Sequence, residues 1–211
     1  MSLERPYEVP ERKLITATHY YEMGSSVLKN KLGITDPKRA AEEETVGFIQ
    51  AQAIFSRKLT KQTKFDEKYI RSIHRTALGH LYLFAGHYRN VNLSKAGHHF
   101  LPFVFIPRGM EYLEFEFLSK LPIEYEDVKK LIEDIAIIQC ELIHIHPFRE
   151  GNGRTARIFA DLMANRAGYP SLEFDKFRQE NYQDYIKALN QGDEKDYSAM
   201  IEIIRALFSV S

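Results

Sequence analysis

One twelve-residue stretch, His146 to Arg157, concentrates side chains that could do chemistry. It reads His-Pro-Phe-Arg-Glu-Gly-Asn-Gly-Arg-Thr-Ala-Arg, and so places an imidazole, a carboxylate, an amide and guanidinium groups in one segment. Apolar residues recur every three or four positions on both sides of it, which is typical of helices. The stretch is therefore expected to be a polar loop held between two helices.

The imidazole of His146 is suited to accept a proton. Pro147 disfavours helical backbone at the residue before it, so the helix that approaches from Val128 is expected to end at or just before His146. A histidine has a pKa suited to a general base near neutral pH. Phe148 is apolar between polar neighbours and is interpreted as the anchor of the loop in the core.

The remaining residues of the stretch could bind phosphate and a metal ion. Glu150 offers hard oxygen ligands to Mg²⁺, which usually binds through one or two carboxylates and substrate phosphates. Gly151-Asn152-Gly153 leads into a helix, where a turn of this kind directs backbone N–H groups at an anion. Arg154 and Arg157 share a face of that helix, and guanidinium groups match phosphate oxygens. The set predicts a site for a nucleoside triphosphate.

Each of these residues also has an ordinary explanation. Two glycines between helices are normal turn chemistry, and an arginine pair three apart is usually a solvated face. His98-His99, with His144 and His146, raises zinc as an alternative. Zinc would leave Pro147 and the glycines unexplained, and no third ligand has helical spacing to the pair. The combined spacing therefore favours the nucleotide site.

At this point the sequence resembles the Fic family. The family signature is His-Pro-Phe-x-Asp/Glu-Gly-Asn-Gly-Arg-x-x-Arg, and residues 146–157 fit every fixed position. Leu83-Phe84-Ala85-Gly86-His87-Tyr88-Arg89 is similar to an Ala-Gly-x-x-Arg segment that leads into a β-hairpin called the flap. Lys31-Leu32-Gly33-Ile34 resembles the start of the core in short toxin-like members. The resemblance predicts a Fic domain over residues 31–211 and an N-terminal extension over residues 1–30, for which a helix is one option.

The resemblance implies an all-α fold, a helical bundle with a small β-hairpin flap. It implies a nucleotidyltransferase, a protein adenylyltransferase that moves AMP from ATP to a Tyr, Thr or Ser hydroxyl of a target protein. The target would be presented at the flap, at about residues 89–107, by main-chain pairing. The resemblance implies that His146 is the general base and that Glu150 is the Mg²⁺ ligand. Gly151, Asn152 and Gly153 would bind the α- and β-phosphates. Arg154 and Arg157 would bind phosphate oxygens, with Arg157 nearest the γ-phosphate.

Two alternatives stay open. The first is a Doc-like kinase or a transferase that uses another nucleotide donor, although Doc-type sequences have Lys where this chain has Gly153. The second is a non-catalytic nucleotide-binding interaction module, against which the intact base, metal ligand and both arginines count.

Regulation leaves a weaker trace in the sequence. Many Fic proteins carry an inhibitory helix, Ser/Thr-x-x-x-Glu-Gly/Asn, whose Glu pairs with the second arginine of the signature. Thr18 to Glu22, Thr63 to Glu67 and Ser198 to Glu202 begin in this way, but none is followed by Gly or Asn. Inhibition through Glu22 or Glu202 is thus a partial match, and an antitoxin-like partner is the favoured hypothesis if the chain is inhibited.

Composition sets the remaining bounds. A chain of 211 residues with 44% hydrophobic residues can bury a sizeable core. Its formal net charge of zero does not indicate a nucleic-acid partner. The single Cys140 cannot form an internal disulfide and is expected to be a core residue in a reducing compartment. No run approaches the roughly 18 apolar residues of a membrane span, and no signal peptide is evident, so a cytoplasmic location is expected.

Periodicity and punctuation predict the elements that position the site. Asp36-Pro37 is a helix start, an N-cap followed by proline at the first helical position. The run of acidic residues 42–44 is attributed to the helix dipole. The helix over 127–145 is apolar around much of its circumference, so it is expected to be central and buried. The predicted elements are helices over 36–57, 65–78, 109–118, 127–145, from 153, 176–190 and 196–208, and a two-stranded ribbon over 89–107.

Overall fold

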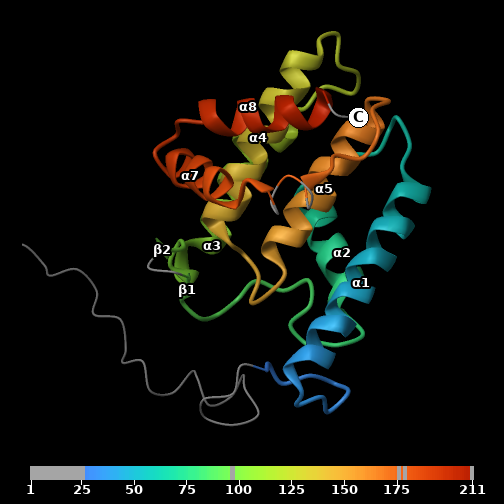
Figure 1. The fold of residues 1–211 in the computed structure, drawn as a ribbon, viewed down its shortest axis with the longest axis vertical. Helices are drawn as coiled ribbons and strands as arrows, with labels where there is room; N and C mark the ends of the chain where they lie inside the picture. The colour runs from blue at the N-terminus through green and yellow to red at the C-terminus, as the bar shows by residue number, and fades with distance from the viewer. Residues whose placement is uncertain (1–26, 96–97, 175–176, 178–179, 210–211) are drawn as a thin grey trace, which may run out of the picture.

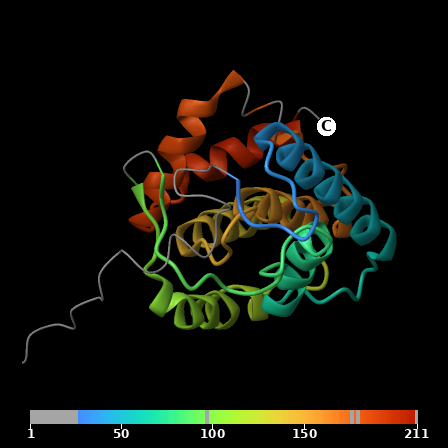
Figure 2. The ribbon, with the colours of Figure 1, turned by 90° about the horizontal axis from the view of Figure 1, so that it is seen from below.

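Helix α4 (Val128–Ile145) runs through the middle of the fold (Figure 1). It packs against α3 (Ile106–Glu116), α5 (Asn152–Arg166), α7 (Tyr182–Asp193) and α8 (Ser198–Ser209). Seen from below, α4 and α5 lie at the centre and the other helices surround them (Figure 2). The protein is all-α, as predicted, in a computed structural model that describes residues 27–95, 98–174, 177 and 180–209.

The sequence of α4 explains its central place. Asp127 caps the helix, since its side chain accepts a hydrogen bond from the backbone N–H of Lys129. Apolar side chains on nearly every side of the helix are buried, including Leu131, Ile135 and Leu142. The predicted central, buried helix is therefore confirmed, and its C-terminus gives the polar loop a rigid base.

Helices α1 (Pro37–Lys58) and α2 (Glu67–Leu78) form the side wall next to α5. The side chain of Asp36 accepts a hydrogen bond from Arg39 N, which confirms the predicted start of α1. The two helices come very close at Gly47, where an added Cβ would lie 2.0 Å from the carbonyl oxygen of Ala77. Glycine is needed there because any side chain would push α1 away from α2.

The ribbon predicted over residues 89–107 is much shorter in the structure. Strands β1 (Ser94–Lys95) and β2 (His98–His99) pair antiparallel, with Ser94 opposite His99. The prediction that 103–105 belong to the returning strand is wrong, because they form a 3-10 turn, η1 (Phe103–Phe105), that leads into α3. The side chain of Asn92 accepts a hydrogen bond from Phe103 N and holds that turn. A second short 3-10 turn, η2 (Leu118–Lys120), follows α3.

The N-terminal boundary at residues 30 and 31 stays a prediction. Val27 and Leu28, on the extension side of that boundary, are buried in the core. Lys31 is tied to the turn after α2, since its backbone N–H donates to Leu81 O over 2.8 Å. Among the described residues, no helix combines the length and the hydrophobicity that a membrane crossing needs.

Candidate active site

The polar loop connects α4 to α5 through two residues in the left-handed backbone region. His146 ends α4 with φ 48°, and Gly151 caps α5 with φ 81°. A left-handed backbone costs a residue other than glycine roughly 1–2 kcal/mol, so the surrounding contacts must hold His146 in place. Phe148 supplies such a contact: its side chain is fully buried, which confirms it as the anchor.

The buried amide of Asn152 closes the loop. Its Oδ1 accepts a hydrogen bond from Phe148 N, and its Nδ2 donates to Phe148 O, both over 2.8 Å. The side chain is thus committed to the loop backbone. If Asn152 binds phosphate, as the resemblance implies, it does so through its backbone N–H at the start of α5.

His74 of α2 packs against the loop and hydrogen-bonds to it. Gly86 N donates to Nδ1 of His74 over 2.8 Å, so Nε2 carries the proton and donates to Glu150 O, also over 2.8 Å. The ring stacks on Phe148 with centroids 3.9 Å apart. Burial lowers the pKa of His74 to about 4, so the ring is neutral near pH 7. His74 is therefore a hydrogen-bonded core residue.

The imidazole of His146 is held in a form suited to a base. Its Nδ1 lies 3.1 Å from the carbonyl oxygen of Ile143. A carbonyl can only accept, so Nδ1 carries the proton in the neutral ring and Nε2 keeps a lone pair. Phe100, which follows β2, stacks on the ring with a centroid distance of 3.6 Å and an interplanar angle of 15°.

The predicted site residues meet, in part, at one cavity of about 670 Å³. The hairpin, the loop and α7 form its walls. The predicted residues among its lining are His146, Glu150, Asn152, Gly153 and Arg157. Base, carboxylate and α5 N-terminus therefore face the same space, and Gly151 lies just outside this lining.

Glu150 fits a role as ligand of a divalent cation. Its Oε1 accepts from Gly151 N over 2.8 Å and lies 3.3 Å from an Nη atom of Arg154. Its Oε2 takes part in neither contact, and the side chain is 46% exposed where it lines the cavity. A carboxylate oxygen outside both contacts suits a Mg²⁺ ion that also binds phosphate. Among the described residues, no cluster of three His, Cys, Asp or Glu could hold a metal by itself, so phosphate would have to complete this site.

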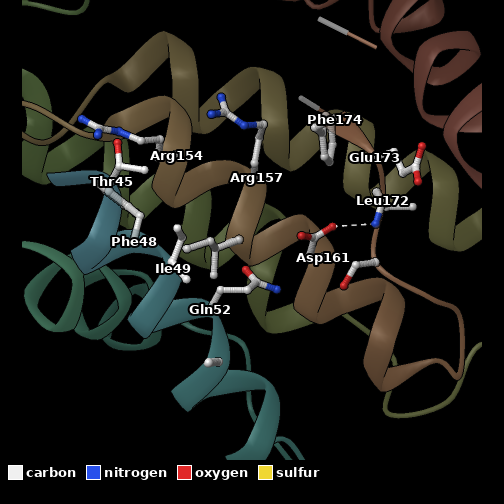
Figure 3. Close-up of a pocket in the computed structure, with 13 residues that line it drawn as sticks. Thr45, Phe48, Ile49, Gln52, Arg154, Arg157, Asp161, Leu172, Glu173 and Phe174 are labelled. Carbon is white, nitrogen blue, oxygen red and sulfur yellow. Dashed lines mark hydrogen bonds between the residues drawn. The ribbon is translucent and has the colours of Figure 1, made fainter. Parts of the chain in front are cut away.

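Arg154 and Arg157 face different surroundings. Figure 3 shows both beside a second cavity, of about 830 Å³, between α1 and α5. Arg157 lines this cavity and the first one. Arg154 lines only the second, where its Nη2 pairs with Glu44 Oε2 over 2.5 Å and its guanidinium lies 4.5 Å from the ring centroid of Phe48. Arg154 thus ties α1 to the loop, whereas Arg157 is the one of the two that lines the first cavity.

Glu44 is a residue whose part the sequence did not reveal. Its Oε1 accepts a hydrogen bond from the hydroxyl of Tyr82 over 2.6 Å, while its other oxygen pairs with Arg154. The acidic run 42–44 had an apparent explanation in the helix dipole, but Glu44 lies beyond the first turn of α1. Its partner Arg154 is 110 residues away in the chain, so no local pattern indicates the pair.

Arg89 is the second such residue. It is 4% exposed, and its guanidinium donates to four backbone carbonyls, those of Val91, Leu101, Ile145 and His146, over 2.5–3.3 Å. Its own backbone N–H donates to Pro147 O over 2.8 Å. Two of these carbonyls are at the C-terminus of α4, where helix carbonyls lack partners and a cation is favoured. Burial lowers the pKa of Arg89 to about 10, so it stays charged at neutral pH. In the sequence, only the Ala-Gly-x-x-Arg segment, which ends at Arg89, pointed to this residue.

The other titratable residues considered from sequence have structural roles. Cys140 is buried, and burial raises the pKa of its thiol to about 12, which confirms a core residue. His144 pairs through Nδ1 with Asp193 over 2.7 Å. Glu202 is 67% exposed and pairs with Arg205 on its own helix. The partial match from Thr18 to Glu22 lies outside the described residues.

Known proteins are similar to this chain in sequence. The Fic/DOC family model matches residues 64–164. Protein adenylyltransferase Fic of Culex quinquefasciatus is 29% identical over 181 residues, and that of Drosophila willistoni is 28% identical over 182 residues. Each alignment covers 83% of this chain but 35% of the relative, so the chain spans about a third of the length of these relatives.

Solved structures show the same fold. The N-terminal Fic domain of a cell filamentation protein from Bartonella quintana superposes with a TM-score of 0.74 at 24% identity, over 90% of both chains. BepC from Bartonella tribocorum, solved with AMPPNP bound, superposes with a TM-score of 0.73 at 22% identity, over 90% of this chain and 96% of that one.

Proposed function

We propose that the chain is a protein adenylyltransferase of the Fic/DOC family, which moves AMP from ATP to a hydroxyl group of a target protein. One observation carries the proposal: the imidazole of His146 and the N-terminus of α5 belong to residues that line the same cavity. A base next to an anion site is what nucleotidyl transfer to a hydroxyl requires.

The reaction follows from this geometry. Nε2 of His146 takes the proton of a Tyr, Thr or Ser hydroxyl as its oxygen attacks the α-phosphorus of ATP. The bond between the α-phosphorus and the bridging oxygen to the β-phosphate breaks, and pyrophosphate leaves with the electron pair. The products are the AMP ester of the target and pyrophosphate, and the protonated imidazole returns its proton to solvent.

The other site residues stabilise the charge of the triphosphate. We assign the backbone N–H groups of Gly151, Asn152 and Gly153 to the α- and β-phosphates, since preorganised donors at a helix N-terminus stabilise charge that develops in the transition state. Arg157 is assigned to the β- and γ-phosphates. Mg²⁺ bound through Glu150 would neutralise charge on the leaving group. Arg154, paired with Glu44, would act mainly through its hold on Glu150.

The hairpin β1–β2 is proposed to present the target. It contributes Leu93, Ser94 and Phe100 to the cavity wall, so a segment paired along its edge would bring a hydroxyl near His146. The named relatives are protein adenylyltransferases, which supports a protein as the acceptor. An antitoxin-like inhibitor stays a prediction.

Labelled ATP tests the proposal. The chain is incubated with a cell lysate and Mg²⁺ and with ATP labelled at either the α- or the γ-phosphate. Label that depends on the added chain should enter protein from the α-position alone, and His146→Ala should abolish it, with a rate loss of at least about a hundredfold. His80→Ala, which removes an imidazole outside the cavity, is the matched control. Label from the γ-position alone would show the Doc-like kinase reaction instead, and nucleotide binding without labelled protein would favour an interaction module.

A further inference from the structure

The face of the His146 imidazole is covered by the ring of Phe100, which comes from the hairpin rather than from the loop. The centroid distance of 3.6 Å leaves no room for water between the two rings. Both residues line the cavity, so the stack forms part of its wall. The proposed reaction uses Nε2 of the imidazole but gives Phe100 no part.

The imidazole needs a second restraint. The torsion that turns a histidine ring about Cβ–Cγ has broad minima, so it is weakly fixed by itself. The contact of Nδ1 with Ile143 O, at 3.1 Å, fixes one edge of the ring. A flat ring stacked on one face limits the tilt of the imidazole plane, whereas an aliphatic side chain would not. An aromatic face also accommodates the imidazolium that forms after proton transfer.

The backbone of Phe100 is itself well held. Its N–H donates to Leu93 O over 3.2 Å, which extends the pairing of β1 with β2. The next residue, Leu101, donates to His144 O over 3.3 Å and accepts from Arg89 over 2.5 Å. The same guanidinium donates to the carbonyl oxygen of His146 over 2.7 Å. One buried cation thus fixes the backbones on both sides of the stack relative to each other.

We propose that Phe100 is a positioning residue that orients the imidazole of the general base, His146. The hairpin would then orient this ring and also present the target. This inference rests on the proposed function for its kinetic consequences, but the ring geometry that it predicts does not depend on the reaction. The side chain acts through His146 and is assigned no contact with the nucleotide phosphates.

Three variants separate orientation from simple packing. Phe100→Tyr keeps the flat ring, Phe100→Leu keeps an apolar side chain without a flat face, and Phe100→Ala removes both. The stabilisation energy of an aromatic pair predicts a kcat that is about two- to tenfold lower for Phe100→Leu. The loss should be larger for Phe100→Ala, and kcat should change by less than about twofold for Phe100→Tyr. The KM for ATP should stay within about twofold in all three. Phe105→Ala, an exposed aromatic outside the cavity lining, is the control.

A second measurement does not need activity. Nitrogen NMR of the histidine rings reports whether His146 occupies one tautomer. The wild-type chain and Phe100→Tyr should show the Nδ1–H form, whereas Phe100→Ala should show a mixture that exchanges between forms. Retention of the single tautomer and of full kcat in Phe100→Ala would overturn the inference. A rise in kcat would also overturn it, because the ring would then shield the base. If the wild-type chain labels no protein, the proposed function fails, and the NMR result still decides the orientation of the ring.

Discussion

Replacing His74 by phenylalanine removes the hydrogen bonds that join α2 to the loop, while the stack on Phe148 can persist. The variant leaves two backbone groups, Gly86 N and Glu150 O, without their imidazole partner. An unsatisfied buried polar group costs about 1–3 kcal/mol. At pH 7 we therefore expect His74→Phe to lower the free energy of unfolding by roughly 2–6 kcal/mol.

The size of this loss should depend on pH. Burial lowers the pKa of His74 from 6.5 to about 4, so between these values the unfolded chain binds a proton that the folded chain does not. The wild-type protein then loses about 1.4 kcal/mol of stability per pH unit as the pH falls, or about 3 kcal/mol by pH 4. The variant has no imidazole at this position and lacks that loss. The gap between the two proteins should narrow from pH 7 to pH 4 and then stay constant.

Urea unfolding at several pH values measures the difference in free energy of unfolding between the wild type and His74→Phe. Carboxylates titrate in both proteins, so their contribution cancels in this difference. Ile73→Val, a fully buried change on the same helix, is the control. It should cost about 1 kcal/mol at every pH. Parallel stability curves for the wild type and His74→Phe from pH 7 to pH 4 would refute the assignment of a neutral, doubly hydrogen-bonded imidazole.

Three further experiments probe the contacts around the loop. Arg89→Lys replaces a planar group that donates to four carbonyls by one that cannot reach them all, so urea unfolding should show a loss of about 3 kcal/mol and transfer should slow. A double-mutant cycle of Glu44→Ala with Arg154→Ala should give a coupling energy of about 1–3 kcal/mol, and additive effects would show that the pair contributes nothing. Gly151→Ala places a Cβ 2.8 Å from Cζ of Phe48 at φ +81°, so it should cost about 2–4 kcal/mol and weaken ATP binding measured by calorimetry, whereas unchanged values would contradict the close packing.

Local patterns in the sequence were enough to predict most helices and the candidate site. Caps such as Asp36 and Asp127 act over two or three residues, so they can be recognised without the fold. The apolar periodicity of residues 128–145 likewise reports burial directly. The hairpin was the exception: the apolar run 100–105 suggested a strand, but residues 103–105 turn toward α3.

What the sequence determined by itself is the chemical content of the site, because the residues from His146 to Arg157 are contiguous and their types imply a base, a metal ligand and an anion turn. Only the tertiary structure decided how each of them is held. Arg154 pairs with Glu44, which is 110 residues away in the chain, and Arg89 donates hydrogen bonds to carbonyl oxygens as far as 57 residues away. The stack of Phe100 on His146 arises in the same way, from the docking of the hairpin on α4. Such contacts depend on the packing of whole helices and of the hairpin. Packing brings together residues that are far apart in the sequence, at separations that follow no regular pattern.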